Sequence, residues 1–125
     1  MRAVIDHISK PEIKAKKLEP WKQLMADAAR HDGLYCKLSG MITEADHLQW
    51  SAEDLRPYIE HVVDCFGWDR VIFGSDWPVC LLAGTYDQVV EALTEVLRPR
   101  MDGPSEDKLF GKNAADFYKL NPEAR

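Results

Sequence analysis

The stretch "RVIFGSDWPV", residues 70–79, runs from an apolar segment into a carboxylate with no polar transition. Its apolar, β-favouring residues predict a short buried strand over residues 70–73. Asp76 follows, between Gly74 and the pair Trp77-Pro78. A carboxylate in that position has three possible roles: it caps a turn, it pairs with an arginine, or it takes part in catalysis at the end of the strand. The rest of the chain bears on which of these alternatives holds.

Two further segments predict strands, and amphipathic segments separate the three. Residues 2–8 ("RAVIDHI") mix Val and Ile with alternating polar residues, and residues 34–38 ("LYCKL") are closed by Ser39-Gly40. Strands that alternate with amphipathic helices predict a parallel sheet, so we expect an α/β fold of parallel β-strands with covering helices. The length of 125 residues suits one domain over residues 1–125.

Capping signals delimit the expected helices. Ser51 with Asp54, and Thr85 with Gln88, resemble capping boxes. Ser105 is expected to cap the last helix, whereas residues 41–50 give mixed signals and are interpreted as a loop. Four apolar stripes have helical spacing: Trp21, Leu24, Met25, Ala28 and Ala29; Leu55, Ile59, Val62 and Phe66; Val89, Leu93, Val96 and Leu97; and Leu109, Phe110, Ala114, Phe117 and Tyr118.

Composition narrows the class of protein. The net charge of −5 gives no electrostatic support for a nucleic-acid partner, and the apolar runs are too short for a membrane span. No signal peptide opens the chain. Three cysteines without zinc-like spacing predict reduced thiols in a cytoplasmic protein. We interpret them as small core residues; the alternative, Cys80 as a nucleophile, has no histidine in an obvious partner position.

Polar residues follow all three predicted strands. Asp6-His7 end the first, Lys37 and Ser39 lie at the end of the second, and Ser75-Asp76 follow the third. The carboxyl ends of parallel strands share one rim, where ligands of such sheets bind. The sequence therefore predicts a site at this rim.

Each of these residues also has a structural interpretation. His7 could be a core histidine, and because neighbouring strand residues point to opposite faces, only one of Asp6 and His7 would face the interior. Lys37 could instead lie on the helix-covered face and extend its ammonium to solvent. Asp76, in a partly apolar setting beside Trp77, has the surroundings of a general base.

Four segments together resemble the carboxyl-terminal half of an amidohydrolase-related protein: "VIDHISKP", "YCKLSGM", "RVIFGSDWPV" and "LFGKNAADFYKL". More narrowly, they are similar to the sugar-lactone and 2-pyrone-4,6-dicarboxylate lactonases of the amidohydrolase superfamily. The resemblance implies a TIM-type (β/α)₈ barrel, of which this chain would form the carboxyl-terminal part. It implies that Asp76 activates water and that His7 binds or polarises the substrate carbonyl.

The expected function is therefore hydrolysis of a lactone, such as a sugar lactone. Asp76 and His7 are the expected catalytic residues, and we assign Lys37, Ser39 and Trp77 to substrate binding. Lactone opening needs a deprotonated water and a group that stabilises the oxyanion; Asp76 can provide the first, and His7 with Lys37 or a metal the second. A divalent metal, zinc before others, would use His7 and Asp76 as ligands; action without a metal is the alternative.

The chain also departs from the family pattern. A full barrel needs about 250 residues, whereas three strands are predicted here, and the His-x-His of the family's first strand is absent. We expect the isolated chain to show little activity, and a homo-oligomer or another pairing to complete the barrel. The alternative functions are a non-catalytic fragment or isoform acting by association, and a metal-dependent amidohydrolase or decarboxylase on the same scaffold.

Overall fold

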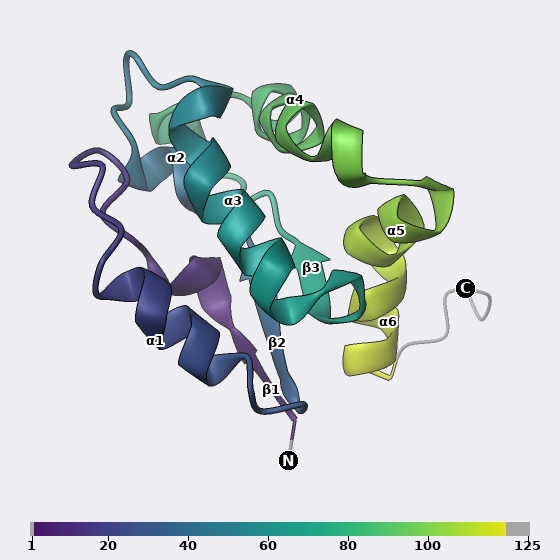
Figure 1. The fold of residues 1–125 in the computed structure, drawn as a ribbon. Coiled ribbons are helices and arrows are strands. Elements are labelled where there is room, and N and C mark those ends of the chain that lie inside the picture. Colours follow the sequence, from purple (N-terminus) through teal and green to yellow (C-terminus); the bar gives the residue numbers. More distant parts are fainter. Residues whose placement is uncertain (1, 120–125) are drawn as a thin grey trace.

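The computed structural model describes residues 2–119, and a parallel three-stranded sheet lies at its centre (Figure 1). The strands are β1 (Ala3–Ile5), β2 (Leu34–Leu38) and β3 (Val71–Phe73), in that spatial order. Cys36 of β2 is in register with Ile5 on one side and Val71 on the other. The parallel sheet predicted from the sequence is confirmed, and the carboxyl ends of all three strands meet at one rim.

Six α-helices surround the sheet in the described part of the chain. They are α1 (Trp21–Ala28), α2 (Met41–Glu44), α3 (Ala52–Phe66), α4 (Tyr86–Leu97), α5 (Gly103–Asp107) and α6 (Asn113–Phe117). In Figure 1, α3 crosses the sheet, with α1 on one side and α5 and α6 on the other. Among residues 2–119, none of the helices is long and apolar enough to cross a bilayer. Residue 1 and residues 120–125 of the predicted domain lie outside the described residues.

The capping signals explain how α3 and α4 begin. Asp54 accepts a hydrogen bond from the Ser51 backbone at 3.0 Å, and Gln88 accepts one from Thr85 at 2.8 Å, so both predicted capping boxes are confirmed. The predicted stripes of these two helices are buried between them and the sheet: Leu55, Ile59, Val62 and Phe66 on α3, and Val89, Leu93, Val96 and Leu97 on α4.

The structure differs from the sequence prediction in two segments, the one that follows β2 and the last predicted helix. Met41–Glu44, predicted as a loop, forms the short helix α2. The last predicted helix begins earlier, because Asp102 rather than Ser105 is its cap: the Asp102 carboxylate accepts the Ser105 N–H at 2.8 Å. It is also divided, since a π-helical turn, Lys108–Lys112, separates α5 from α6.

The first strand ends earlier than predicted, and this determines where His7 lies. After Ile5 the chain enters a tight turn, Asp6–Ser9, in which His7 and Ile8 have φ of 48° and 43°. The left-handed backbone continues through Lys10 and costs free energy in non-glycine residues, above all in a β-branched one. Burial of the Ile8 side chain offsets that cost, as does a buried hydrogen bond of 2.7 Å from Trp21 Nε1 to the Ile8 carbonyl.

This bond predicts the effect of Trp21→Phe. The ring would still pack, but the Ile8 carbonyl would lose its indole donor, so we expect the free energy of unfolding to fall by about 1–3 kcal/mol. Urea denaturation measures the change. Trp68→Phe is the matched control, because no hydrogen bond from the Trp68 indole to another described residue is present, and it should cost less. Equal losses in the two variants would contradict the role of the Trp21 hydrogen bond.

Candidate functional site

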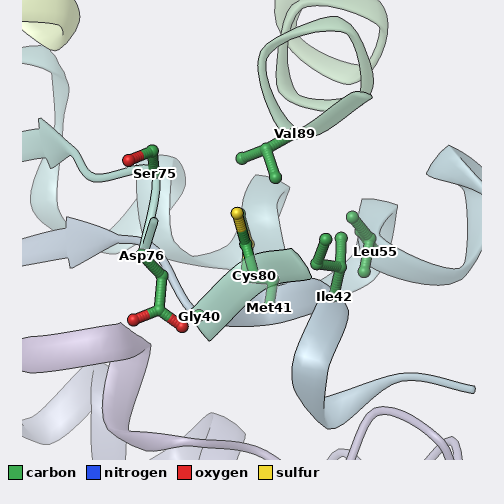
Figure 2. Close-up of a pocket in the computed structure, with 8 residues that line it drawn as sticks. All are labelled: Gly40, Met41, Ile42, Leu55, Ser75, Asp76, Cys80 and Val89. Atoms are coloured by element: carbon green, nitrogen blue, oxygen red, sulfur yellow. The ribbon is translucent and has the colours of Figure 1, made fainter. Parts of the chain in front are cut away.

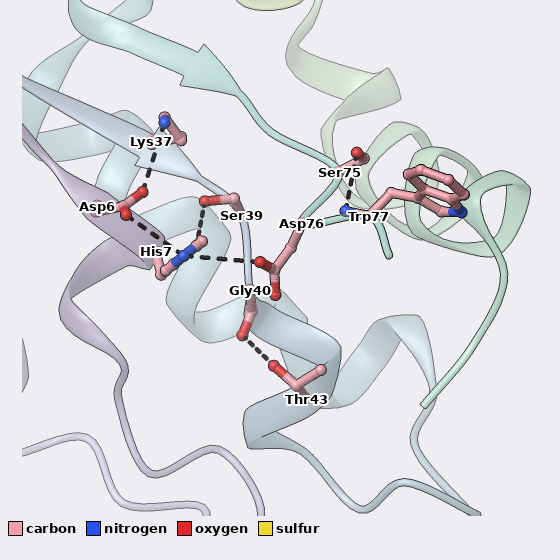
Figure 3. A network of polar contacts seen from close by, with 9 residues as sticks. All are labelled: Asp6, His7, Lys37, Ser39, Gly40, Thr43, Ser75, Asp76 and Trp77. Carbon is pink, nitrogen blue, oxygen red and sulfur yellow. Dashed lines mark hydrogen bonds and ion pairs between the residues drawn. The ribbon is translucent and has the colours of Figure 1, made fainter. Parts of the chain in front are cut away.

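The polar residues predicted at the strand ends come together in the folded chain. His7, from the turn after β1, lies between Ser39, which follows β2, and Asp76, which follows β3 (Figure 3). Lys37, the fourth residue of β2, extends toward the same place through its contact with Asp6. The site is thus built by side chains from all three strand ends.

Both ring nitrogens of His7 face other polar groups. Nδ1 lies 2.8 Å from Ser39 Oγ, a hydrogen-bond distance. Nε2 lies 3.4 Å from a carboxylate oxygen of Asp6 and 3.7 Å from one of Asp76. The side chain is 26% exposed, so part of the ring is reachable from outside. These two longer distances leave Nε2 without a short hydrogen bond and able to contact an incoming oxygen atom.

Asp76 is held close to His7 by an unusual backbone. Its φ is 58°, in the left-handed region, and its side chain is only 15% exposed. Within the described residues its carboxylate lies beside the His7 imidazole and not beside an arginine. The turn contact at this position is made by the main chain instead, since the Asp76 carbonyl accepts the Cys80 N–H at 2.7 Å. A carboxylate that no arginine or lysine among the described residues neutralises can accept a proton.

Two glycines allow the strand ends to approach one another. A Cβ at Gly40, where φ is 65°, would lie 2.9 Å from the His7 ring. A Cβ at Gly74 would lie 2.8 Å from the Ser39 Cβ and 3.0 Å from the Lys37 side chain. Both distances are too short for a side chain, so glycine at these two positions is a condition for the geometry of the site.

Asp6 is a residue of the cluster to which sequence reasoning assigned no role. Its two carboxylate oxygens lie 3.4 Å from His7 Nε2 and 3.5 Å from Lys37 Nζ, so it links these two side chains, although it is 60% exposed. The assumption that Asp6 and His7 alternate along a strand hid this role. The left-handed turn directs the side chains of Asp6 and His7 to the same rim.

Lys37 lies opposite the core-facing residues of its strand. Cys36 and Leu38 are buried in the hydrophobic core, and Lys37, alternating with them, points to the other face. Its aliphatic stem passes beside Gly74, which places the ammonium at the site.

Trp77 is oriented differently from its neighbour Asp76. Figure 3 shows its ring directed away from His7 and Asp76, and the residue is 63% exposed. Its backbone N–H donates to Ser75 Oγ at 3.2 Å. Within the described chain, Trp77 therefore contributes an exposed apolar surface beside the carboxylate and no contact with His7.

A small cavity lies behind Asp76 (Figure 2). It measures about 10 Å³, close to the lower limit for a single water molecule. The cavity has no room for a molecule larger than water. The residues that line the cavity are Gly40, Met41, Ile42, Leu55, Ser75, Asp76, Cys80 and Val89.

Cys80 is a core residue rather than a nucleophile. Its side chain is buried, and burial together with the neighbouring Asp76 carboxylate raises the pKa of the thiol. The reactive thiolate is thereby disfavoured. Cys36 is likewise buried, which raises its pKa to about 12.

The same residues can be tested as a metal site. The chemistry of the donor set is suitable, since imidazole and carboxylate both bind zinc, but a catalytic zinc takes three protein ligands. No group of three or more His, Cys, Asp or Glu side chains with metal-binding geometry occurs within residues 2–119. The described residues thus supply an incomplete ligand set.

Comparison with known proteins identifies the relatives of this chain. The amidohydrolase family matches residues 1–120. An L-fucono-1,5-lactonase of Burkholderia ambifaria is 40% identical over 97% of this chain and 42% of its own length. An L-fucono-1,5-lactonase of Burkholderia multivorans is 36% identical over 94% of this chain and 43% of its own. The chain thus spans less than half the length of these relatives.

A solved structure shows the same arrangement of elements. The crystal structure of an amidohydrolase from Burkholderia multivorans with bound zinc superposes with a TM-score of 0.88 at 36% identity. The match covers 96% of this chain and 44% of that one. The predicted fold, part of a TIM-type barrel, is confirmed by this likeness together with the parallel sheet.

Proposed function

Because the chain belongs to the amidohydrolase family, we propose that the protein hydrolyses a sugar lactone or a similar cyclic ester, with Asp76 as the base that activates water. The observation that carries the proposal is the position of the Asp76 carboxylate. It lies 3.7 Å from His7 Nε2, at the rim where the carboxyl ends of the three strands meet. The similarity to two proteins named as lactonases supports the class of substrate.

The proposed reaction follows from the positions of three side chains. Asp76 takes a proton from a water molecule, and the water oxygen forms a bond to the lactone carbonyl carbon. The carbonyl oxygen becomes an oxyanion, which His7 Nε2 and the Lys37 ammonium stabilise. The ring C–O bond then breaks, and the protonated Asp76 returns its proton to the departing ring oxygen. The product is an open-chain hydroxy acid.

A metal is not used in these steps. Zinc is bound in the related crystal structure, and in this chain His7 and Asp76 would be the ligands it could use. Zinc would polarise the carbonyl if a third ligand came from outside the described residues.

We propose that activity requires completion of the barrel. The outer edges of β1 and β3 have no partner strand within residues 2–119, and unpaired edges are available for pairing. Either sequence that flanks the chain or a second polypeptide, a further copy included, would supply the strands.

Three cysteines without a disulfide support a reducing compartment, the cytoplasm.

A panel of small cyclic substrates tests the function. The protein, expressed with any sequence that flanks it in its gene, is mixed with five- and six-membered sugar lactones and with cyclic amides of the same size. Acid release at constant pH is recorded for the lactones. Ring opening of the amides is monitored by chromatography of the amino-acid product, because at neutral pH its amine takes up the proton that its carboxyl group releases. We expect hydrolysis of sugar lactones and none of amides. Hydrolysis of amides alone would favour the alternative amidohydrolase function, and no release from any lactone would contradict the proposal.

A further inference from the structure

We propose that Ser39 is a positioning residue: its hydroxyl donates a hydrogen bond to His7 Nδ1 and so fixes the ring as the tautomer that carries its proton on Nε2. The proposal deepens the proposed function, because it rests on His7 acting at the same site. It assigns Ser39 a role through His7 in place of direct contact with substrate.

The direction of the hydrogen bond follows from the surroundings of the Ser39 hydroxyl. Ser39 is 1% exposed, so water does not reach its side chain freely. The partner of its Oγ atom within the described residues is His7 Nδ1, at 2.8 Å. If Nδ1 carried the proton, the hydroxyl would accept that bond and its own hydrogen would have no acceptor among the described residues. A buried donor without an acceptor is costly, so the hydroxyl donates.

The surroundings of the other nitrogen favour the same tautomer. Nε2 faces carboxylate oxygens of Asp6 at 3.4 Å and Asp76 at 3.7 Å. Two carboxylates attract an N–H and repel a nitrogen lone pair. Lys37, the other charged group of the cluster, contacts Asp6. Both sides of the imidazole therefore point to a proton on Nε2.

Two glycines leave room for this arrangement. A Cβ at Gly40 would come within 2.9 Å of the His7 Cγ and Nδ1 atoms. A Cβ at Gly74 would come within 2.8 Å of the Ser39 Cβ. Glycine at both positions thus allows the hydroxyl and the imidazole to lie 2.8 Å apart.

This tautomer defines what His7 can do. A neutral imidazole with its proton on Nε2 donates a hydrogen bond to an oxyanion, whereas a zinc ligand needs a lone pair on the same nitrogen. In the absence of metal, the structure therefore assigns His7 the role of a hydrogen-bond donor to the oxyanion. Binding of zinc through Nε2 would require the proton to move to Nδ1 and the Ser39 hydroxyl to reverse.

Nitrogen NMR of the imidazole tests the inference. In the protein labelled with ¹⁵N, at a pH where His7 is neutral, the two-bond couplings identify the protonated nitrogen. We expect the proton on Nε2. The measurement is made on protein freed of metal by a chelator, and a proton on Nδ1 in the unaltered protein would overturn the proposal without any variant being made.

Ser39→Ala tests the contribution of the hydroxyl. Loss of one hydrogen bond should move the ratio of the two tautomers about tenfold toward Nδ1–H. For a lactone that is hydrolysed, kcat should fall about tenfold while KM stays within about twofold, because the Nε2 donor acts on the oxyanion of the transition state. An unchanged tautomer ratio or an unchanged kcat would count against the role of Ser39.

Thr43→Val is the matched control. The Thr43 hydroxyl donates to the Gly40 carbonyl at 3.1 Å, one residue from Ser39, and does not contact the His7 ring (Figure 3). This variant should leave tautomer and kcat unchanged; if it changed both as Ser39→Ala does, the effect would be general loosening of the turn and the proposal would fail. A protein with Nε2–H and no lactonase activity would refute the proposed function while leaving the tautomer assignment standing.

Discussion

Asp76→Asn should lower kcat/KM for a sugar lactone about a thousandfold, within the range of about 10²–10⁴ that general-base catalysis contributes. The amide has nearly the shape of the carboxylate and can keep the contact with His7, but it cannot take a proton from water. The main-chain bond from Cys80 N–H to the Asp76 carbonyl is untouched, so the turn should persist. Initial rates of acid release, compared with the thermal unfolding midpoint of each protein, separate loss of the base from loss of the fold.

Asp6→Asn is the matched control for this variant. Asp6 also places a carboxylate oxygen near His7 Nε2, at 3.4 Å, but its side chain is 60% exposed and therefore well solvated. We expect a fall of less than about tenfold, from looser placement of His7 and Lys37. Equal losses in the two variants would mean that Asp76 is one charge among several and not the base.

Gly40→Ala should reduce kcat/KM about a hundredfold, the effect expected when a catalytic group is displaced by about 1 Å. The added Cβ would lie 2.9 Å from the His7 ring, which cannot remain where it is. The positive φ of 65° adds a backbone cost of about 1 kcal/mol, so the protein should also be less stable. Lactone kinetics together with urea denaturation measure both effects.

Gly67→Ala distinguishes the two causes. Gly67 has φ of 72° at the end of α3, but nothing lies within 4 Å of a Cβ placed there. This substitution therefore introduces backbone strain without a clash and should lower stability while leaving kcat/KM of the folded protein nearly unchanged. If Gly67→Ala lost activity to the same degree, strain in the chain rather than displacement of His7 would explain the result for Gly40→Ala.

Local patterns in the sequence were sufficient for much of the fold. The stripes of α3 and α4 and their capping boxes depend on residues three and four apart, and such short-range signals are visible in the chain itself. Gly67 marks the end of α3 for the same reason. The π-helical turn that separates α5 from α6 has no local signal, since the same apolar stripe is compatible with one continuous helix.

The assignment of polar residues to the strand ends also came from the sequence, because parallel strands place their carboxyl ends together whatever the helices do. The roles of the individual residues within the cluster did not come from the sequence. Asp6 was passed over because residues 2–8 were taken as one extended strand, and the left-handed turn that begins at His7 depends on a buried isoleucine and on a hydrogen bond from Trp21, thirteen residues away from Ile8. Trp77 was assigned to substrate binding, and nothing in the sequence indicated that its ring lies exposed and turned from His7.

By itself the sequence determined the α/β class, the parallel sheet, the starts of α3 and α4, and the rim at which His7, Lys37, Ser39 and Asp76 would meet, since these follow from periodicity, capping signals and the direction of the chain. Only the tertiary structure decided which nitrogen of His7 faces Ser39, that Asp6 joins His7 to Lys37, and how Trp77 is turned. These features depend on contacts between segments far apart in the chain and on a strained backbone that long-range packing holds in place, and no local pattern encodes either.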